Sequence, residues 1–94
     1  MSFRMTVDEV FVIKRRGVVA TGRVDSGVVR VGDTVHINGG PGVTVDAIEQ
    51  FRKHRDEAGV GETIGVLFKN IDRSDIDRGA VLTGSGSDAA PFIV

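Results

Sequence analysis

GVVATGRVDSGVVRVGD, residues 17–33, is the stretch that decides the fold of this chain. Its first part, Val18 to Val24, is rich in β-branched residues suited to a strand. Asp25-Ser26-Gly27 interrupts that pattern, Val28 to Val31 resumes it, and Gly32-Asp33 ends it. Two short apolar segments joined by a three-residue turn that contains glycine are typical of a β-hairpin. We expect this hairpin to form the middle of a small antiparallel barrel.

Further strand-like segments lie on both sides of it. Four apolar residues in a row end the segment 7–13, and the other candidate strands are 35–37, 43–51, 62–68 and 80–82. Turn or loop signals at 14–17 and 38–42 separate the first of these segments. A charged connection is expected at 52–59, and a single helical turn at 71–79 with Ser74 as its N-cap. The predicted fold class is therefore all-β, a small closed antiparallel barrel of about six to seven strands.

The predicted organisation has three parts. Residues 1–6 are expected to be a frayed lead-in, 7–83 the barrel domain, and 84–94 a flexible Gly/Ser-rich tail. The last four residues, Pro91 to Val94, are apolar enough to add an edge strand.

Composition excludes several classes of function. The chain has 94 residues, 12 Lys and Arg against 13 Asp and Glu, and a net charge of -1, so any preference for anionic partners must come from a local patch. It has no cysteine for disulfides or thiolate metal sites, and no apolar segment that approaches the ~20 residues of a membrane span. The lack of Trp and Tyr argues against a stacking platform for single-stranded nucleic acid. These features fit a cytoplasmic protein.

The sequence offers no catalytic constellation. It has no P-loop motif, no G-x-G-x-x-G after a strand and no serine in a G-x-S-x-G context. His36 and His54 lie on different segments without a second ligand at metal-binding spacing, and His36 is expected to face solvent. We expect a protein without enzymatic activity, cofactor or metal.

Charged residues supply the remaining candidates. Lys14-Arg15-Arg16 and Arg52-Lys53-His54-Arg55 would form a phosphate-binding patch if they came together, with Lys14, Arg15, Arg16, Arg52, Lys53 and Arg55 as its cations. The alternative is two solvated turns balanced by neighbouring carboxylates. Glu49 stands in an apolar segment and is either an outward-facing edge carboxylate or a hydrogen-bond acceptor at a pocket.

Three motifs are specific in combination: residues 17–33 quoted above, IEQFRK at 48–53 and DIDRGAVL at 75–82. Together they resemble the second domain of elongation factor Tu, the β-barrel that follows the GTPase domain in translational GTPases. The resemblance runs from about Asp8 to Leu82. No GTPase motif occurs in the sequence, so the chain by itself is not expected to bind GTP.

The resemblance implies a binding module for the aminoacylated 3′ end of transfer RNA, or contact with RNA or ribosome-associated factors. It implies a terminal-adenosine pocket at Ile13, Val19, Glu49 and Leu67. It also implies an aminoacyl side at Asp8, Glu9, Phe11, Thr21 and Thr63. The alternative is a protein–protein interaction scaffold that has lost RNA binding.

The chain departs from the family pattern at several positions. Asp8-Glu9 has the reverse order of the family's acidic pair, and Thr63 replaces an amide residue. The family's G-R-G turn becomes Arg15-Arg16-Gly17, so a bulky cation replaces a glycine. A positive φ at Arg15 would strain this turn.

Overall fold

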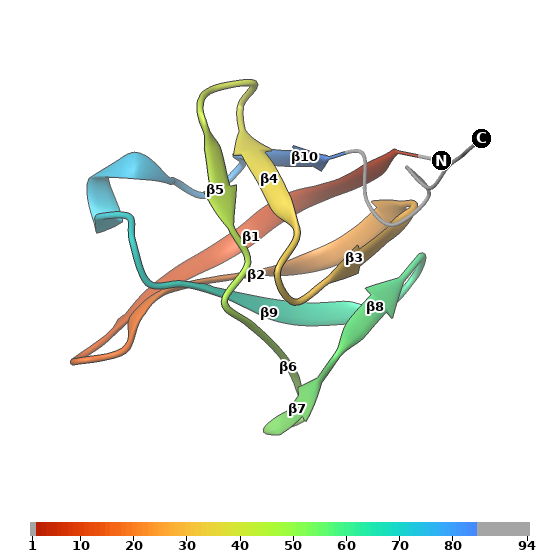
Figure 1. Ribbon diagram of the computed structural model, residues 1–94, viewed down its shortest axis with the longest axis horizontal. Helices are drawn as coiled ribbons and strands as arrows, with labels where there is room; N and C mark the ends of the chain where they lie inside the picture. Colours follow the sequence, from red (N-terminus) through yellow and green to blue (C-terminus); the bar gives the residue numbers. More distant parts are fainter. Residues whose placement is uncertain (1, 85–94) are drawn as a thin grey trace.

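The computed structural model describes residues 2–84, which form an almost entirely antiparallel β-structure (Figure 1). Within this range one 3-10 turn, η1 (Arg73–Asp75), accompanies the strands. The strands are β1 (Phe3–Ile13), β2 (Gly17–Ser26), β3 (Val28–Arg30), β4 (Thr34–Ile37), β5 (Gly42–Thr44), β6 (Ala47–Gln50), β7 (Lys53–Arg55), β8 (Glu57–Gly59), β9 (Thr63–Phe68) and β10 (Val81–Gly84).

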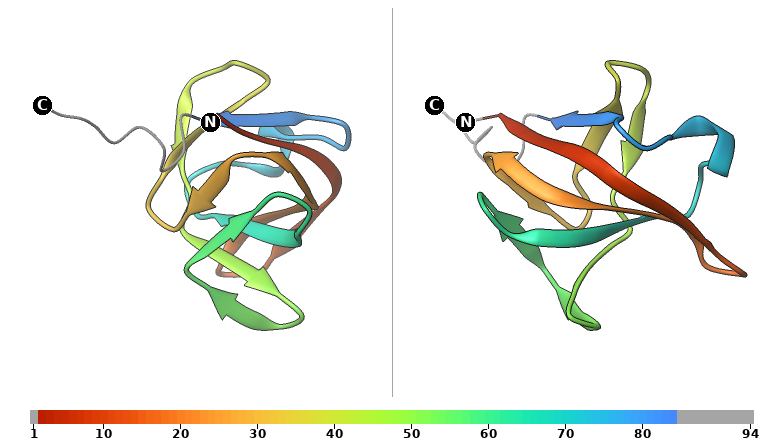
Figure 2. Two further views of the ribbon diagram at one scale, coloured as in Figure 1. Left: turned by 90° about the vertical axis from the view of Figure 1, so that its right-hand side faces the viewer. Right: turned by 180° about the vertical axis from the view of Figure 1, so that it is seen from behind.

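Eight strands form one sheet in the order β5-β4-β10-β1-β2-β9-β6-β7, and β3 and β8 form a separate two-stranded ribbon. The large sheet curls into a half-barrel, which the ribbon completes (Figure 2). Backbone hydrogen bonds join the residues after β3 to the segment between β5 and β6, from Gly32 N to Val45 O at 2.8 Å and from Val45 N to Asp33 O at 2.9 Å. The predicted all-β, antiparallel barrel architecture is confirmed.

Alternation of buried and exposed residues along the strands builds one core. In β2, Val18, Ala20, Gly22 and Val24 are buried, while Val19, Thr21 and Arg23 between them face outward. The largest core side chains are Phe3, Phe68, Met5, Ile48, Ile76 and Leu82. No charged or polar side chain of the described residues is fully buried. Side-chain direction along each strand is therefore set by the burial of apolar surface.

The expectation of a hairpin within residues 17–33 is wrong. β2 pairs with β1 on one side and with β9 on the other, so neither of its edges is left for β3. Gly27, with a φ of +69°, turns the chain away, and β3 pairs with β8 instead. The hairpin that does form is β1–β2, closed by the basic turn at 14–16.

The N-terminal expectation is also wrong for residues 3–6. They form the first part of β1, where Phe3 pairs with Gly84 and Met5 with Leu82 of β10. Phe3 and Met5 are 1% and 0% exposed. The lead-in looked frayed because its partner strand lies about eighty positions away in the chain, beyond the reach of a local pattern.

Three further segments differ from their predictions. Two of these differences add strands, so that residues 2–84 contain ten. The strand expected at 43–51 divides into β5 and β6, because Val45 turns into the core and bonds to the residue 32–33 backbone. The charged connection at 52–59 contains β7 and β8. Asp72, not Ser74, stands at the N-cap of η1.

The tail at 85–94 and its predicted edge strand lie outside the described residues, and Gly84 ends β10. Among residues 2–84, no helix has the length and apolar character needed to cross a membrane.

Replacing Phe3 by alanine should lower the free energy of unfolding by about 3–5 kcal/mol, because it opens a cavity in the core. Phe11→Ala is the matched control in the same strand. Its side chain is 52% exposed, and the change should cost less than about 1 kcal/mol. Chemical denaturation of the two variants measures the difference. Equal losses would contradict the placement of Phe3 in the core.

Candidate functional site

Two rows of side chains run across the outer face of the barrel through β1, β2, β9 and β6. The pairing register places Phe11, Val19, Leu67 and Ala47 in one row. It places Glu9, Thr21, Gly65 and Glu49 in the next. The alternate residues of the same strands, Ala20, Val66 and Ile48, are buried in the core. Antiparallel pairing thus gathers on one surface residues that are far apart in the sequence.

A pocket of about 310 Å³ lies on this surface, which we call the outer pocket. Gly65 forms part of its base. A Cβ atom there would stand 3.2 Å from Val19 Cγ1 and 3.7 Å from Thr21 Cγ2, so glycine keeps the space open. Its lining residues are Val19, Thr21, Glu49, Gln50, Phe51, Arg52, Thr63, Ile64 and Gly65.

Glu49 presents the carboxylate of the outer pocket to two basic groups. Its Oε2 lies 3.4 Å from Arg16 Nη2 and 3.8 Å from His54 Nδ1. The Glu49 side chain is 33% exposed and that of Arg16 47%. Long, solvent-accessible ion pairs of this kind contribute little free energy, so a ligand can displace them.

Two left-handed residues form the turn that borders the outer pocket. Gln50 pairs with Lys53 across β6 and β7, and Phe51 and Arg52 between them have φ of +52° and +66°. Positive φ at both central residues is the pattern of a type I′ turn, which normally uses Asn or Gly. Phe51 is 88% exposed as a result. A strained turn that displays an aromatic ring and a cation is a signal of a binding surface.

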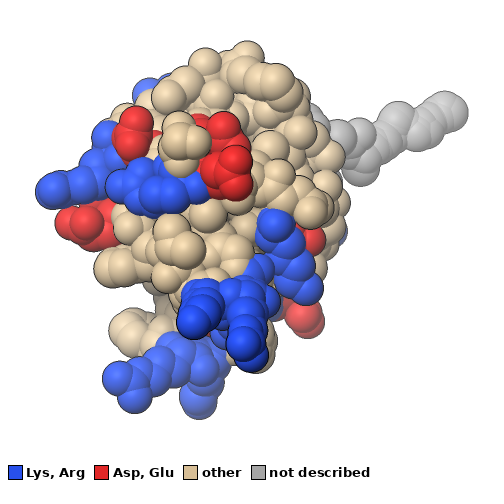
Figure 3. Space-filling model, turned by 90° about the vertical axis from the view of Figure 1, so that its left-hand side faces the viewer, with Lys and Arg blue, Asp and Glu red and all other residues tan. Residues whose placement is uncertain are grey.

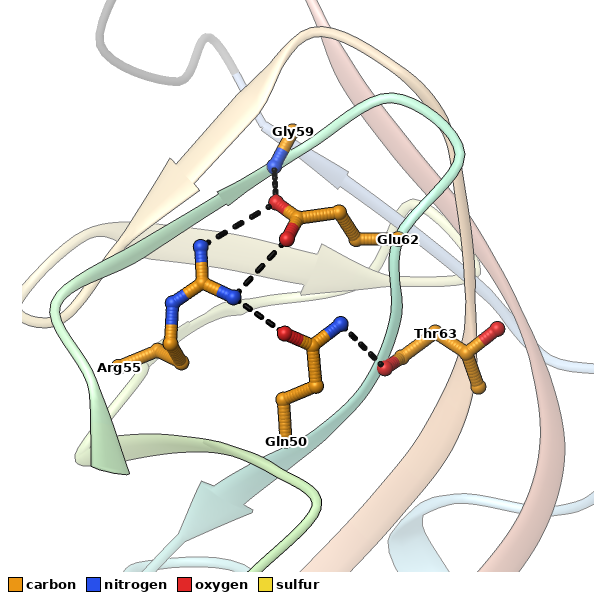
Figure 4. Close-up of polar contacts among 5 residues, drawn as sticks. All are labelled: Gln50, Arg55, Gly59, Glu62 and Thr63. Atoms are coloured by element: carbon orange, nitrogen blue, oxygen red, sulfur yellow. Dashed lines mark hydrogen bonds and ion pairs between the residues drawn. The ribbon is translucent and has the colours of Figure 1, made fainter. Parts of the chain in front are cut away.

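A hydrogen-bonded network holds the opposite wall in place (Figure 4). Arg55 donates to both carboxylate oxygens of Glu62, at 2.9 and 3.5 Å, and also to Gln50 Oε1. Gln50 Nε2 donates to Thr63 O at 3.3 Å, and Gly59 N donates to Glu62 Oε1 at 2.8 Å. The sequence predicts that Arg55 belongs to a basic patch. In the structure it instead holds Gln50, which lines the outer pocket and in turn bonds to Thr63.

The other basic residues occupy two turns. Lys14, Arg15 and Arg16 lie on the β1–β2 turn, and Arg52 and Lys53 lie at the β6–β7 turn. Figure 3 shows the end of the molecule onto which the β1–β2 turn projects, with several clusters of Lys and Arg side chains on it. From the β1–β2 turn, the guanidinium of Arg16 reaches Glu49 in β6, next to the β6–β7 turn.

A family model described as Elongation factor Tu domain 2 matches residues 17–83. The chain belongs to this family. The matched region includes every described strand except β1, which precedes residue 17. It ends one residue before the end of β10. The structure joins β1 to the matched region through nine paired positions of β2.

The structure brings together in the outer pocket four of the residues expected at the adenosine and aminoacyl sites, Val19, Thr21, Glu49 and Thr63, with Arg52 of the expected basic patch. Leu67 lies in the outer row but is only 4% exposed. Phe11 is in the same row, outside the pocket lining, and Ile13 lines a different pocket at the β1–β2 turn.

The acidic pair lies apart from the outer pocket. The carbonyl oxygen of Asp8 accepts a 3.3 Å hydrogen bond from Arg78 Nε, and Glu9 Oε2 is 3.5 Å from Arg78 Nη2. A β-bulge between Val7 and Glu9 changes the direction of β1 here. The Glu9 carboxylate and the Asp8 backbone are therefore both held by Arg78, which lies in the segment between η1 and β10.

Sequence reasoning missed Gln50, Phe51, Ile64 and Gly65 as lining residues. Phe51 was read as the end of a strand, and only the left-handed turn exposes it. Gly65, in the middle of an apolar strand, is a signal in the sequence for this pocket, because such a glycine often marks a close approach of another group to the backbone.

Glu62→Gln should destabilise the domain at neutral pH. The hydrogen bond from Gly59 N, followed by that from Arg55, lowers the pKa of Glu62 from its ordinary 4.5. A lowered pKa stabilises the folded state above the unfolded value, and that contribution is lost as the pH falls through the folded value. The melting temperature of Glu62→Gln should therefore lie below that of the parent at pH 7 and converge with it as the pH falls below 4.5 and through the lowered pKa of the folded state.

Glu57→Gln is the control for this experiment, because the Arg30–Glu57 ion pair is exposed on both sides. A difference between Glu62→Gln and the parent that is the same at every pH would contradict the role assigned to this carboxylate.

Proposed function

We propose that this domain is a non-catalytic binding module that accepts the 3′-terminal adenosine of transfer RNA in the outer pocket. The observation that supports this proposal most directly is the register of β2, β9 and β6. This register brings Val19 and Gly65, which form an apolar floor, next to two threonines and one carboxylate in a single pocket. Such a module would act with the translation machinery, and we propose a cytoplasmic location for it.

Each lining group has a role in this proposal. Glu49 accepts a hydrogen bond from a ribose hydroxyl or the adenine amino group, in exchange for its long contact with Arg16. Val19 and Gly65 provide an apolar surface against the base. The exposed ring of Phe51 offers a stacking face, which contributes about 1–3 kcal/mol per base in single-strand binding. Arg52 lines the same pocket and would supply a positive charge for the adjoining phosphate.

Glu49→Ala should weaken binding of transfer RNA by about 10- to 100-fold, because it removes a charged hydrogen-bond acceptor from the pocket. Arg52→Ala should weaken it less and reduce its dependence on salt. Fluorescence anisotropy with aminoacylated and uncharged transfer RNA, at about 50 and about 200 mM salt, measures both effects.

Glu57→Gln, an exposed change on β8 away from the pocket, is the control. The proposal fails if the parent does not bind at the lower salt concentration, or if Glu49→Ala binds as tightly as the parent.

A protein–protein interaction scaffold is the second candidate. The observation that favours it is the exposure of large apolar side chains, Phe11 at 52% and Val12 at 61% on β1 and Phe51 at 88% in the β6–β7 turn. Under this alternative, a protein partner would remain bound after nuclease treatment and would be lost with Phe11→Ser. Recovery of nucleic acid alone would exclude the alternative.

A further inference from the structure

A second pocket, of about 400 Å³, lies between the β1–β2 turn and residues 69–73. We call it the turn pocket. Gly17 lets its two walls meet, because a Cβ atom there would stand 2.4 Å from Phe68 O and 3.1 Å from Lys69 Cα. A 2.7 Å hydrogen bond from Lys69 N to Asp46 Oδ2 holds the second wall. The turn pocket and the outer pocket share no lining residue.

The turn pocket is strongly cationic in a chain whose net charge is -1. Two of its cations are engaged: Arg73 bonds to Ile76 O at 2.7 Å and to Asp77 Oδ1 at 3.1 Å, and Arg16 contacts Glu49. Lys14, Arg15 and Lys69 form no ion pair with a carboxylate of residues 2–84. The full lining is Val12, Ile13, Lys14, Arg15, Arg16, Gly17, Val18, Lys69, Ile71, Asp72 and Arg73, with one carboxylate among five cations.

Arg15 is held at the tip of the turn at a conformational cost. Its φ is +67°, in the left-handed region that glycine adopts without strain. A 2.9 Å hydrogen bond from Arg16 N to Ile13 O closes the turn and keeps Arg15 in that conformation. A bulky cation at such a position is a signal that the side chain itself is used.

The chemistry of the pocket suits a phosphate group. Arginine offers a planar fork that matches phosphate oxygens, and lysine adds mobile point charges. Ile13 and Ile71 give the pocket an apolar part against which the sugar or base of a nucleotide would pack. A phosphate group is common to a free nucleotide and to an RNA strand.

We propose that the turn pocket binds a phosphate group through Lys14, Arg15 and Lys69, and that the bound phosphate competes with Glu49 for Arg16. Arg16 links the two pockets, because it lines the turn pocket while its guanidinium lies against the Glu49 carboxylate of the outer pocket. The 3.4 Å contact to Glu49 is long, and a phosphate carries up to twice the charge of a carboxylate. Occupation of the turn pocket therefore frees Glu49 to accept a ligand. This second step rests on the proposed function; the phosphate site does not.

Nuclear magnetic resonance titrations test the phosphate site directly. Inorganic phosphate and a short oligouridylate are added separately, and the amide resonances of residues 14–18 and 69–73 should shift with both. The oligouridylate should bind at least about tenfold more tightly if the source is an RNA strand, since several phosphates and bases then contribute. Equal affinity per phosphate would assign the site to small phosphorylated ligands.

The variant Lys14→Gln/Arg15→Gln/Lys69→Gln should weaken phosphate binding by at least about tenfold. The control Arg4→Gln/Arg23→Gln/Arg30→Gln removes the same charge from exposed residues that line neither pocket, and it should bind within about threefold of the parent. Equal weakening by the two variants, or shifts spread over all basic segments, would overturn the site.

Adenosine, which carries no phosphate, tests the competition for Arg16. Saturating inorganic phosphate should tighten adenosine binding to the parent by about threefold or more, and should have no effect in Arg16→Gln, where Glu49 is already free. An unchanged adenosine affinity in the parent overturns the competition. Absence of any adenosine binding instead counts against the proposed function and leaves the phosphate titration as a separate result.

Discussion

The register between β1, β2, β9 and β6 is the constraint on which the rest of this structure depends. Each strand buries alternate residues, so a shift of one position would exchange the core face for the outer face. Val18, Ala20, Val66 and Ile48 are buried, and this determines the register. The same register aligns Thr21, Gly65 and Glu49 on the outside. The strand part of the outer pocket is thus a consequence of packing the core, and the β6–β7 turn adds Phe51 and Arg52 to its lining.

Turns that carry side chains in left-handed conformations lie next to both pockets. Four non-glycine residues have positive φ within residues 2–84, and three of them, Arg15, Phe51 and Arg52, belong to the turns that border the turn pocket and the outer pocket. Each such residue costs of order 1–3 kcal/mol. Stability alone would favour glycine or asparagine there, so the cost is consistent with selection for the groups displayed: two guanidinium ions and a phenyl ring.

Arg16 and Glu49 connect the two pockets electrostatically. This ion pair is weak, because both side chains are partly exposed and Arg16 Nη2 lies 3.4 Å from Glu49 Oε2. The Arg55–Glu62 pair is different in kind, since the carboxylate also accepts a backbone hydrogen bond and the guanidinium also holds Gln50. The first pair is the one that our proposals open to exchange with a ligand, whereas the second keeps the wall of the outer pocket in position. Two ion pairs of the same residue types therefore differ in geometry and in the number of hydrogen bonds that hold them.

The amino-acid sequence by itself determined the all-β class, most of the strand positions and the family, because these depend on alternation, β-branched residues and turn signals that are local. The identity of Glu49 as a candidate acceptor was also readable from its place in an apolar segment. Only the tertiary structure decided that β3 pairs with β8, that Phe3 and Met5 belong to the core, and that Phe51 is exposed. It also separated the basic residues into Arg55, which positions a wall, Arg16, which links two pockets, and Arg15, which lines one. The physical reason is that pairing partners and charge partners are chosen across long distances in the chain, where residues 5 and 82 or 16 and 49 meet, and no local pattern records that choice.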